Sequence, residues 1–220
     1  ALALASKSST TVNVTFGVSV AINDIENTIE SLVDDSTVTA GGDLALTAES
    51  DIEIDALTIA GALSGTVASQ QGGLTVDIAG AGAGSGNTIT NTVSATIENG
   101  STVTTNNGGD VSLLATDDST IGAIAGAVSL AVSFSKDTAA NLSFGASAAV
   151  NEITNTVEAG VDDSTVDSDG GLSATAETTA TIDALTVAGA GGGTIVGGNS
   201  GLGLSIAGAG TGSGNDIANT

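Results

Sequence analysis

Two pairs of adjacent aspartates are the residues with the clearest potential for metal chemistry. Asp34-Asp35 and Asp162-Asp163 each lie in a Val-Asp-Asp-Ser-Thr-Val run, and the two runs are 128 positions apart in the chain. Ca²⁺ takes about six to eight oxygen ligands, often from carboxylates. The candidate calcium ligands are therefore Asp34, Asp35, Asp162 and Asp163. The same residues are also typical of solvated turns, so we expect no cofactor, with Ca²⁺ as the alternative left open.

Residues that common catalytic sites require are missing. The chain has no His and no Cys, which excludes a Ser-His-Asp triad, a cysteine nucleophile and a typical zinc site. It also has no Trp or Tyr to line a sugar-binding groove of the kind found in polysaccharide-cleaving β-helices. We therefore predict that it is not an enzyme. A net charge of −23, from 25 acidic residues against two basic ones, argues against nucleic acid as a partner.

A six-residue motif, Asn-x-Ile-x-Asn-Thr, sets the organisation of the chain. Its copies begin at Asn23, Asn87, Asn151 and Asn215, so they recur with a fixed 64-residue spacing. Self-similarity at a fixed period is the signature of repeat architectures. We expect residues 1–220 to form one continuous solenoid segment with partial units at both ends. The full repeat units are predicted at 23–86, 87–150 and 151–214.

A longer, 128-residue period is almost free of gaps. Residues 16–92 match residues 144–220 without an insertion, whereas the intervening unit is a weaker copy. One extra residue lies in Ile97–Val103. Two kinds of 64-residue unit therefore alternate. Because the chain starts and stops within a repeat, we interpret it as part of a longer array.

The second asparagine of each motif is predicted to point inward. Asn27, Asn91 and Asn155 are in phase with the neighbouring Ile and Val residues. A buried amide without a hydrogen bond costs on the order of 1–3 kcal/mol. We therefore expect these three asparagines to bond the main chain at an inner corner of the solenoid.

Alternation of apolar and polar residues predicts β-strands throughout. From Val12 to Ile22, every even residue is apolar, which predicts a strand with this face buried. The phase changes at Asn23-Asp24, where we expect a corner. Turn residues at Asp34–Thr37 and Gly41–Asp43 divide the chain further. With strands of about four to six residues and coils of about 20 residues, the pattern predicts an all-β parallel β-solenoid with about three coils per 64-residue repeat.

The repeat style resembles a known class of bacterial proteins. The segment FGVSVAINDIENTIESLVDDSTVTAGGDLALTAES, residues 16–50, is similar to repeat regions of filamentous-haemagglutinin-like and leukotoxin-like giant adhesins. The resemblance extends over essentially the whole chain but includes no catalytic signature. It implies a right-handed β-helix that is extracellular or on the cell surface of a bacterium.

The expected function is mechanical. We expect a structural repeat segment of a giant extracellular fibrous protein, either an adhesin shaft or a surface filament. Its partners would be other copies, through end-to-end or lateral assembly, and a host or neighbouring cell surface. No membrane span is expected, because the long uncharged run at 184–215 is interrupted by glycines. The alternative is a calcium- or glycan-binding surface module that uses its acidic face.

Overall fold

The computed structural model describes residues 1–6, 10–69, 73–198 and 201–220, and these residues form strands and connecting turns. Within these ranges no helix is long and apolar enough to cross a membrane. The strands are β1 (Leu2–Ser6), β2 (Thr10–Asp34), β3 (Thr37–Ala40), β4 (Leu44–Val67), β5 (Leu74–Glu98), β6 (Thr102–Thr105), β7 (Val111–Ser135), β8 (Thr138–Val161), β9 (Thr165–Asp167), β10 (Leu172–Val196) and β11 (Leu202–Asn219). The predicted all-β class is confirmed.

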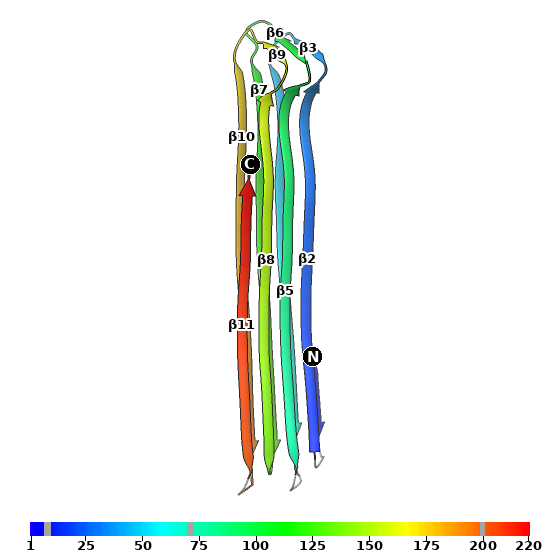
Figure 1. Cartoon of the computed structure of the whole chain (residues 1–220), viewed down its shortest axis with the longest axis vertical. Helices are drawn as coiled ribbons and strands as arrows, with labels where there is room; N and C mark the ends of the chain where they lie inside the picture. The colour runs from blue at the N-terminus through cyan, green and yellow to red at the C-terminus, as the bar shows by residue number, and fades with distance from the viewer. Residues whose placement is uncertain (7–9, 70–72, 199–200) are drawn as a thin grey trace.

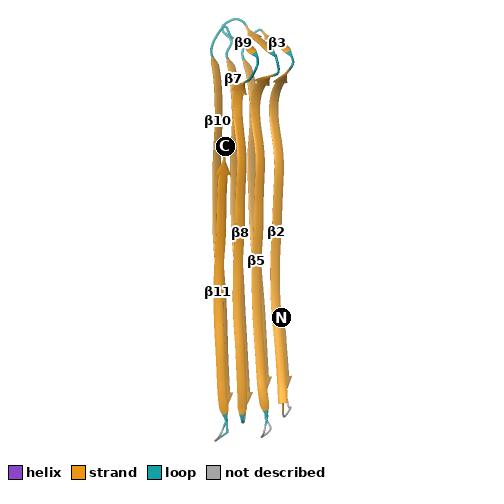
Figure 2. Cartoon of the chain, viewed as in Figure 1, coloured by secondary structure: helices purple, strands orange, loops and turns teal. Residues whose placement is uncertain are grey.

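Each coil consists of two long strands joined by a short one. β2 ascends, β3 crosses the top, and β4 descends on the opposite side before β5 begins the next coil (Figure 1). The ascending strands form a sheet in the order β11-β8-β5-β2, and the descending strands form a sheet in the order β1-β4-β7-β10. The short strands β3, β6 and β9 form a third sheet, the cap, at one end of the molecule (Figure 2). All these strand pairs are parallel, so the predicted parallel β-solenoid is also confirmed.

One 64-residue repeat makes one coil. Asn23 pairs with Asn87, and Asn87 pairs with Asn151, across long parallel strands. The prediction of three coils per repeat is therefore wrong. Each of the strands β2 and β5 has 25 residues, so the prediction of much shorter strands is wrong too. Glycines and polar residues that resemble turns in the sequence lie inside straight strands instead. At about 3.3 Å per residue, a strand of this length extends roughly 80 Å.

The corner expected at Asn23-Asp24 is also absent, because β2 runs without interruption from Thr10 to Asp34. A straight strand keeps its two faces, and the odd residues of β2, which include Ile25 and Ile29, face the interior. The even residues from Val12 to Ile22 consequently face outward. Their exposed fractions include 78% for Val18 and 79% for Ile22. The prediction that this apolar face is buried is wrong.

Three clusters of apolar side chains fill the space between the two long sheets. The first lies near the cap and includes Ile97 and Leu113. The second, further along the strands, includes Ile89 and Ile121. The third, in the half of the molecule furthest from the cap, consists of alanines. The interior therefore changes along the strands from large aliphatic to small side chains.

The 128-residue period has a steric cause on the outer face of the β11-β8-β5-β2 sheet. Phe16, Gly80, Phe144 and Gly208 lie at one level on successive coils. The rings of Phe16 and Phe144 meet above Gly80, with centroids 5.7 Å apart. A Cβ atom at Gly80 would lie 2.6 Å from both rings. A phenylalanine at this level thus requires glycine on the next coil, and two kinds of coil alternate here.

Extra residues of the middle coil are accommodated in its cap turns. Thr37 pairs with Thr102, an offset of 65, and Leu44 pairs with Val111, an offset of 67. The predicted extra residue in Ile97–Val103 corresponds to a turn in which Gly100 has a φ of +77°. This left-handed conformation suits glycine. The insertions change the cap and leave the stacking of the long strands intact.

A substitution at Gly145 tests the close approach of the two sheets. Its buried position faces the opposite sheet, where an added Cβ would lie 2.6 Å from the Gly189 carbonyl oxygen. We expect Gly145→Ala to lower the free energy of unfolding by about 1–3 kcal/mol, because backbone must move to admit the methyl group. Urea denaturation measures this change.

Gly86→Ala is the matched control, since no heavy atom lies within 4 Å of the new Cβ there. Its stability should equal or slightly exceed that of the parent chain. Equal stability of the two variants would contradict the close approach of the sheets at Gly145.

Candidate functional site

The four candidate calcium ligands lie in the exposed turns between the ascending strands and the cap. Asp35 and Asp163 adopt positive φ values of 41° and 44°, and Asn99 occupies the same place in the middle coil with a φ of 58°. Asn99 Nδ2 donates a hydrogen bond of 2.6 Å to Asp34 Oδ1. Aspartate and asparagine tolerate the left-handed conformation better than most residues. The turn geometry alone therefore accounts for these residue types.

The middle coil separates the two aspartate pairs. Asp34 is adjacent to Glu98, and Asp162 N–H donates to the Ile97 carbonyl on the far side of that coil. Residues two coils apart are separated by about 9.6 Å along the solenoid axis. In the part of the chain that the structure describes, no three Asp, Glu, His or Cys side chains form a group that could hold a metal ion. Calcium binding at these aspartates stays a prediction.

The inward asparagines contribute to a buried polar layer around Asp117. Asn91 and Asn155 are at most 1% exposed, whereas Asn27 lies on the first coil and is exposed. Asn91 Nδ2 donates to Asp117 Oδ1 at 2.7 Å, and Asn155 Nδ2 donates to Asp117 Oδ2. Ser119 Oγ donates to the same carboxylate at 2.9 Å. These amides donate to side chains in the middle of strands, and the predicted donation to main chain at a corner is wrong.

The first asparagine of each motif forms a different arrangement, an amide ladder. Nδ2 of Asn23 donates to Oδ1 of Asn87, and Asn87 donates in the same way to Asn151, each at 2.7 Å. Asn151 continues the ladder to Asn215 at 2.9 Å. Such a ladder links successive coils at a single level and stabilises the 64-residue register. This explains why the asparagine recurs.

A second buried carboxylate, Asp77, lies among the small side chains of the half furthest from the cap. It is fully buried and accepts hydrogen bonds from Ser64 Oγ at 2.9 Å and Thr66 Oγ1 at 2.8 Å. Ser133 Oγ donates to its other oxygen. Asn13 Nδ2 donates to Thr66 Oγ1 at 2.7 Å and so supports the same network. Several donors of this kind stabilise a buried carboxylate.

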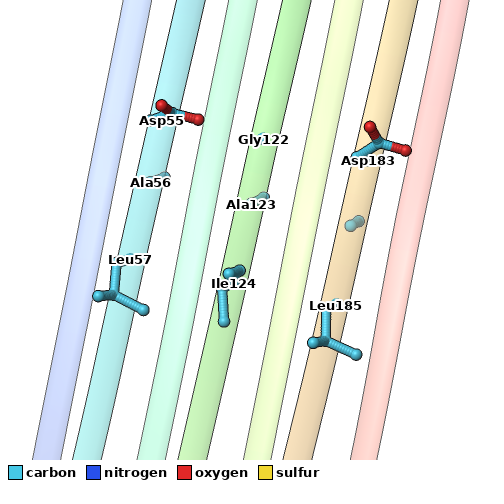
Figure 3. A pocket seen from close by; sticks show the side chains of 9 residues that line it. Asp55, Ala56, Leu57, Gly122, Ala123, Ile124, Asp183 and Leu185 are labelled. Atoms are coloured by element: carbon cyan, nitrogen blue, oxygen red, sulfur yellow. The ribbon is translucent and has the colours of Figure 1, made fainter.

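An open groove of about 600 Å³ crosses the outer face of the β1-β4-β7-β10 sheet. Asp55 and Asp183 flank Gly122, and a row formed by Leu57, Ile124 and Leu185 lies below them (Figure 3). A Cβ atom at Gly122 would lie 2.6 Å from Asp55 Oδ1, so glycine keeps the groove open. The groove offers two carboxylates and an apolar floor. The described residues that line it include no hydroxyl, thiol or imidazole to complete a hydrolytic site.

Sequence reasoning overlooked the buried carboxylates Asp77 and Asp117. Asp77 lies in register with Asn13 and Asn141 at the 64-residue spacing, which marks a polar level of the interior. Asp117 shares the odd phase of the buried Leu113 and Ile121. Aligning the 64-residue repeats as single coils would have found both.

Comparison with known proteins gives no relative: no family model, no curated protein and no solved structure matches this chain. The resemblance of its repeats to giant bacterial adhesins therefore stays a prediction.

Asp117 tests the buried polar layer. Asp117→Ala removes the carboxylate that accepts hydrogen bonds from the buried side-chain amides of Asn91 and Asn155. We expect a loss of about 2–4 kcal/mol in the free energy of unfolding, measured by urea denaturation. Asp118→Ala is the control, because Asp118 is the adjacent residue and faces solvent. A loss of similar size in both variants would show that the layer does not stabilise the fold.

Proposed function

We propose that the chain is a structural repeat segment of an extracellular fibrous protein, in which two alternating kinds of coil stack in a fixed register. The observation that supports this most directly is the 64-residue register of β2, β5 and β8, which the asparagine ladder maintains level by level. No active-site chemistry is needed to explain this regularity. Stacking itself would be the function.

Each coil stabilises the molecule through its neighbours. Ile97 of the middle coil is fully buried, and its equivalents on the neighbouring coils, Val33 and Val161, are more exposed. In such quasi-one-dimensional proteins, stability is close to a sum of repeat and interface terms. A long array would therefore be more stable per residue than a short one.

The shape differs from that of a thin rod. A 64-residue coil advances the solenoid axis by only about 4.8 Å, whereas its strands extend roughly 80 Å across that axis. An array of such coils is therefore a flat slab, with its long strands perpendicular to the direction in which coils are added. We propose that the segment forms part of an extracellular layer or filament. The length of its long strands would set the thickness of that layer or filament.

The composition is consistent with a protein that is exposed outside the cell and resists proteolysis. Acidic residues outnumber basic ones 25 to two, and acidic side chains such as Glu30, Glu98 and Glu158 line an outer groove near the cap. Like charges on neighbouring copies oppose aggregation of the acidic surfaces. Two lysines and no arginine give trypsin few sites to cleave. The resemblance to adhesin repeats supports the same location, on the surface of a bacterium or outside it.

Duplication of two coils tests the stacking proposal. A second copy of residues 23–150, inserted after Val150, preserves the 128-residue alternation. We expect the denaturation midpoint and the m-value both to rise in a single cooperative transition, because two more buried interfaces are added. Small-angle scattering should show growth of about 9.6 Å along the solenoid axis. Two separate transitions, or no increase in stability, would contradict coil-by-coil stacking.

Calcium separates this proposal from the binding-module alternative. Because the candidate aspartates lie in two turns with a coil between them, we expect the melting temperature to be the same in excess Ca²⁺ and in excess chelator. The matched variant replaces Asp34, Asp35, Asp162 and Asp163 with asparagine, which keeps the turn conformation. Stabilisation by Ca²⁺ that this variant abolishes would instead favour a calcium-binding surface module.

A further inference from the structure

The outer surface furthest from the cap has an unusual distribution of apolar side chains. We define the apolar half-face as the outward residues of the β11-β8-β5-β2 sheet within 12–22, 74–86, 140–150 and 202–214. No charged side chain occurs at these outward positions. Val18, Val20 and Ile22 are between 66% and 79% exposed. Beneath them the interior contains alanines and hydroxyl side chains. The larger side chains thus lie on the outside.

The size of the apolar half-face matches that of a protein interface. Four strands at about 4.8 Å and about 11 residues at about 3.3 Å give an area of roughly 19 by 36 Å, or about 700 Å². Stable complexes bury about 800 Å² on each partner. Monomeric proteins rarely expose an apolar patch of this size without a binding function.

The size of the side chains on the apolar half-face varies periodically from coil to coil, which gives the face ridges and grooves. Val18, Gly82, Ala146 and Gly210 lie at one level on successive coils, and the levels of Phe16, Val20 and Ile22 follow a similar pattern. Strands with larger side chains form ridges about 9.6 Å apart, and glycines 80–86 of β5 form a groove between two of them. An open groove lined by Val18, Gly82 and Ala146 follows this line. A face with the same spacing, displaced by one coil, would place its ridge in this groove.

Charge determines the orientation of such a partner. The acidic residues that face outward on this sheet, including Asp24, Glu30, Glu98 and Glu158, all lie on the cap side of the half-face. Two copies aligned in the same direction would bring these carboxylates against one another. Two copies that face each other with antiparallel strands, displaced by one coil, would overlap only where both are apolar. Their acidic halves would then project in opposite directions.

We propose that the apolar half-face binds a second copy of this chain, tail to tail, with the two copies displaced by one coil along the solenoid axis. The relief favours this partner over a lipid surface, because ridges and grooves with a two-coil period complement an identical face and have no counterpart in fluid acyl chains. This inference deepens the proposed function and rests on it, since it names the lateral contact between stacked arrays.

The experiment measures the dimerisation of the whole chain by sedimentation equilibrium and compares it with two glycine variants. Gly82→Val fills the groove, although no heavy atom lies within 4 Å of its Cβ in the monomer. Gly160→Val makes the same change on the same sheet in the acidic half, again with nothing within 4 Å. Circular dichroism and melting temperature check that both variants fold.

We expect the parent chain and Gly160→Val to form dimers with equal Kd, and Gly82→Val to bind at least about tenfold more weakly. Scattering should show a dimer about one and a half times as long as the monomer, because only the apolar halves overlap. Dimerisation should depend little on salt, whereas a parallel alignment would strengthen steeply as salt screens its carboxylates.

Three results would overturn the proposal. A parent chain that stays monomeric up to about 100 μM, where interfaces of this size normally associate, has no such dimer. If that monomer floats with phosphatidylcholine–phosphatidylglycerol vesicles, and Gly82→Val does not change this, the half-face binds lipid instead. Association that is equally strong in Gly82→Val uses another surface. The coil-duplication experiment measures stacking along the axis, so either idea can fail without the other.

Discussion

Parallel stacking of coils at about 4.8 Å is the constraint on which the rest of the structure depends. It fixes the axial neighbour of almost every long-strand residue on the ascending side at 64 positions along the chain. Levels that stabilise this contact repeat the same side chain, as in the asparagine ladder. Levels that cannot repeat a large side chain alternate it with glycine, as at Phe16, Gly80 and Phe144. The 64-residue and the 128-residue periods of the sequence both follow from this one spacing.

Each long strand passes through two regions that differ in which face carries the large apolar side chains. Near the cap, large aliphatic side chains such as Ile97 and Leu113 fill the interior, and carboxylates face solvent. Further from the cap, alanines and hydroxyl groups fill the interior, and valines and phenylalanines face outward. The change in β2 occurs at Asn23, where the apolar residues move from even to odd positions. Hydrophobicity therefore changes face within a continuous strand.

Buried polar side chains divide the interior into levels. The Asp117 layer lies between the two aliphatic clusters, and the Asp77 network lies beyond the alanines. Asp117 accepts hydrogen bonds from amides of the opposite sheet and from a hydroxyl of its own sheet, and Asp77 accepts from hydroxyls of the opposite sheet. A shift of one sheet by two residues would place these groups against aliphatic side chains and leave them without partners. The polar levels thus specify how the two sheets align.

The sequence was sufficient to predict the all-β parallel solenoid, the 64-residue unit, the cap turns and the extra residue of the middle unit. Inward placement followed for Asn91 and Asn155 from their phase with isoleucines. The coil length did not follow, because glycines such as Gly80 and Gly82 resemble turn residues when each repeat is considered alone. The reason for these glycines is a side chain at the same level of the neighbouring coil. The outward face of Val12–Ile22 was mistaken for a similar reason, since alternation identifies two faces and does not say which one is covered.

The length of the coil has a consequence for how the molecule forms. Each long strand pairs with a segment one whole repeat away in the chain, so a long loop must close before any ladder hydrogen bond is made. Non-local parallel pairing of this kind folds slowly. Once one coil is complete, however, its edge presents a strand of 25 residues of ordered backbone to the next. Nucleation is then the slow event and growth is templated, so coils would be added in sequence as the chain emerges.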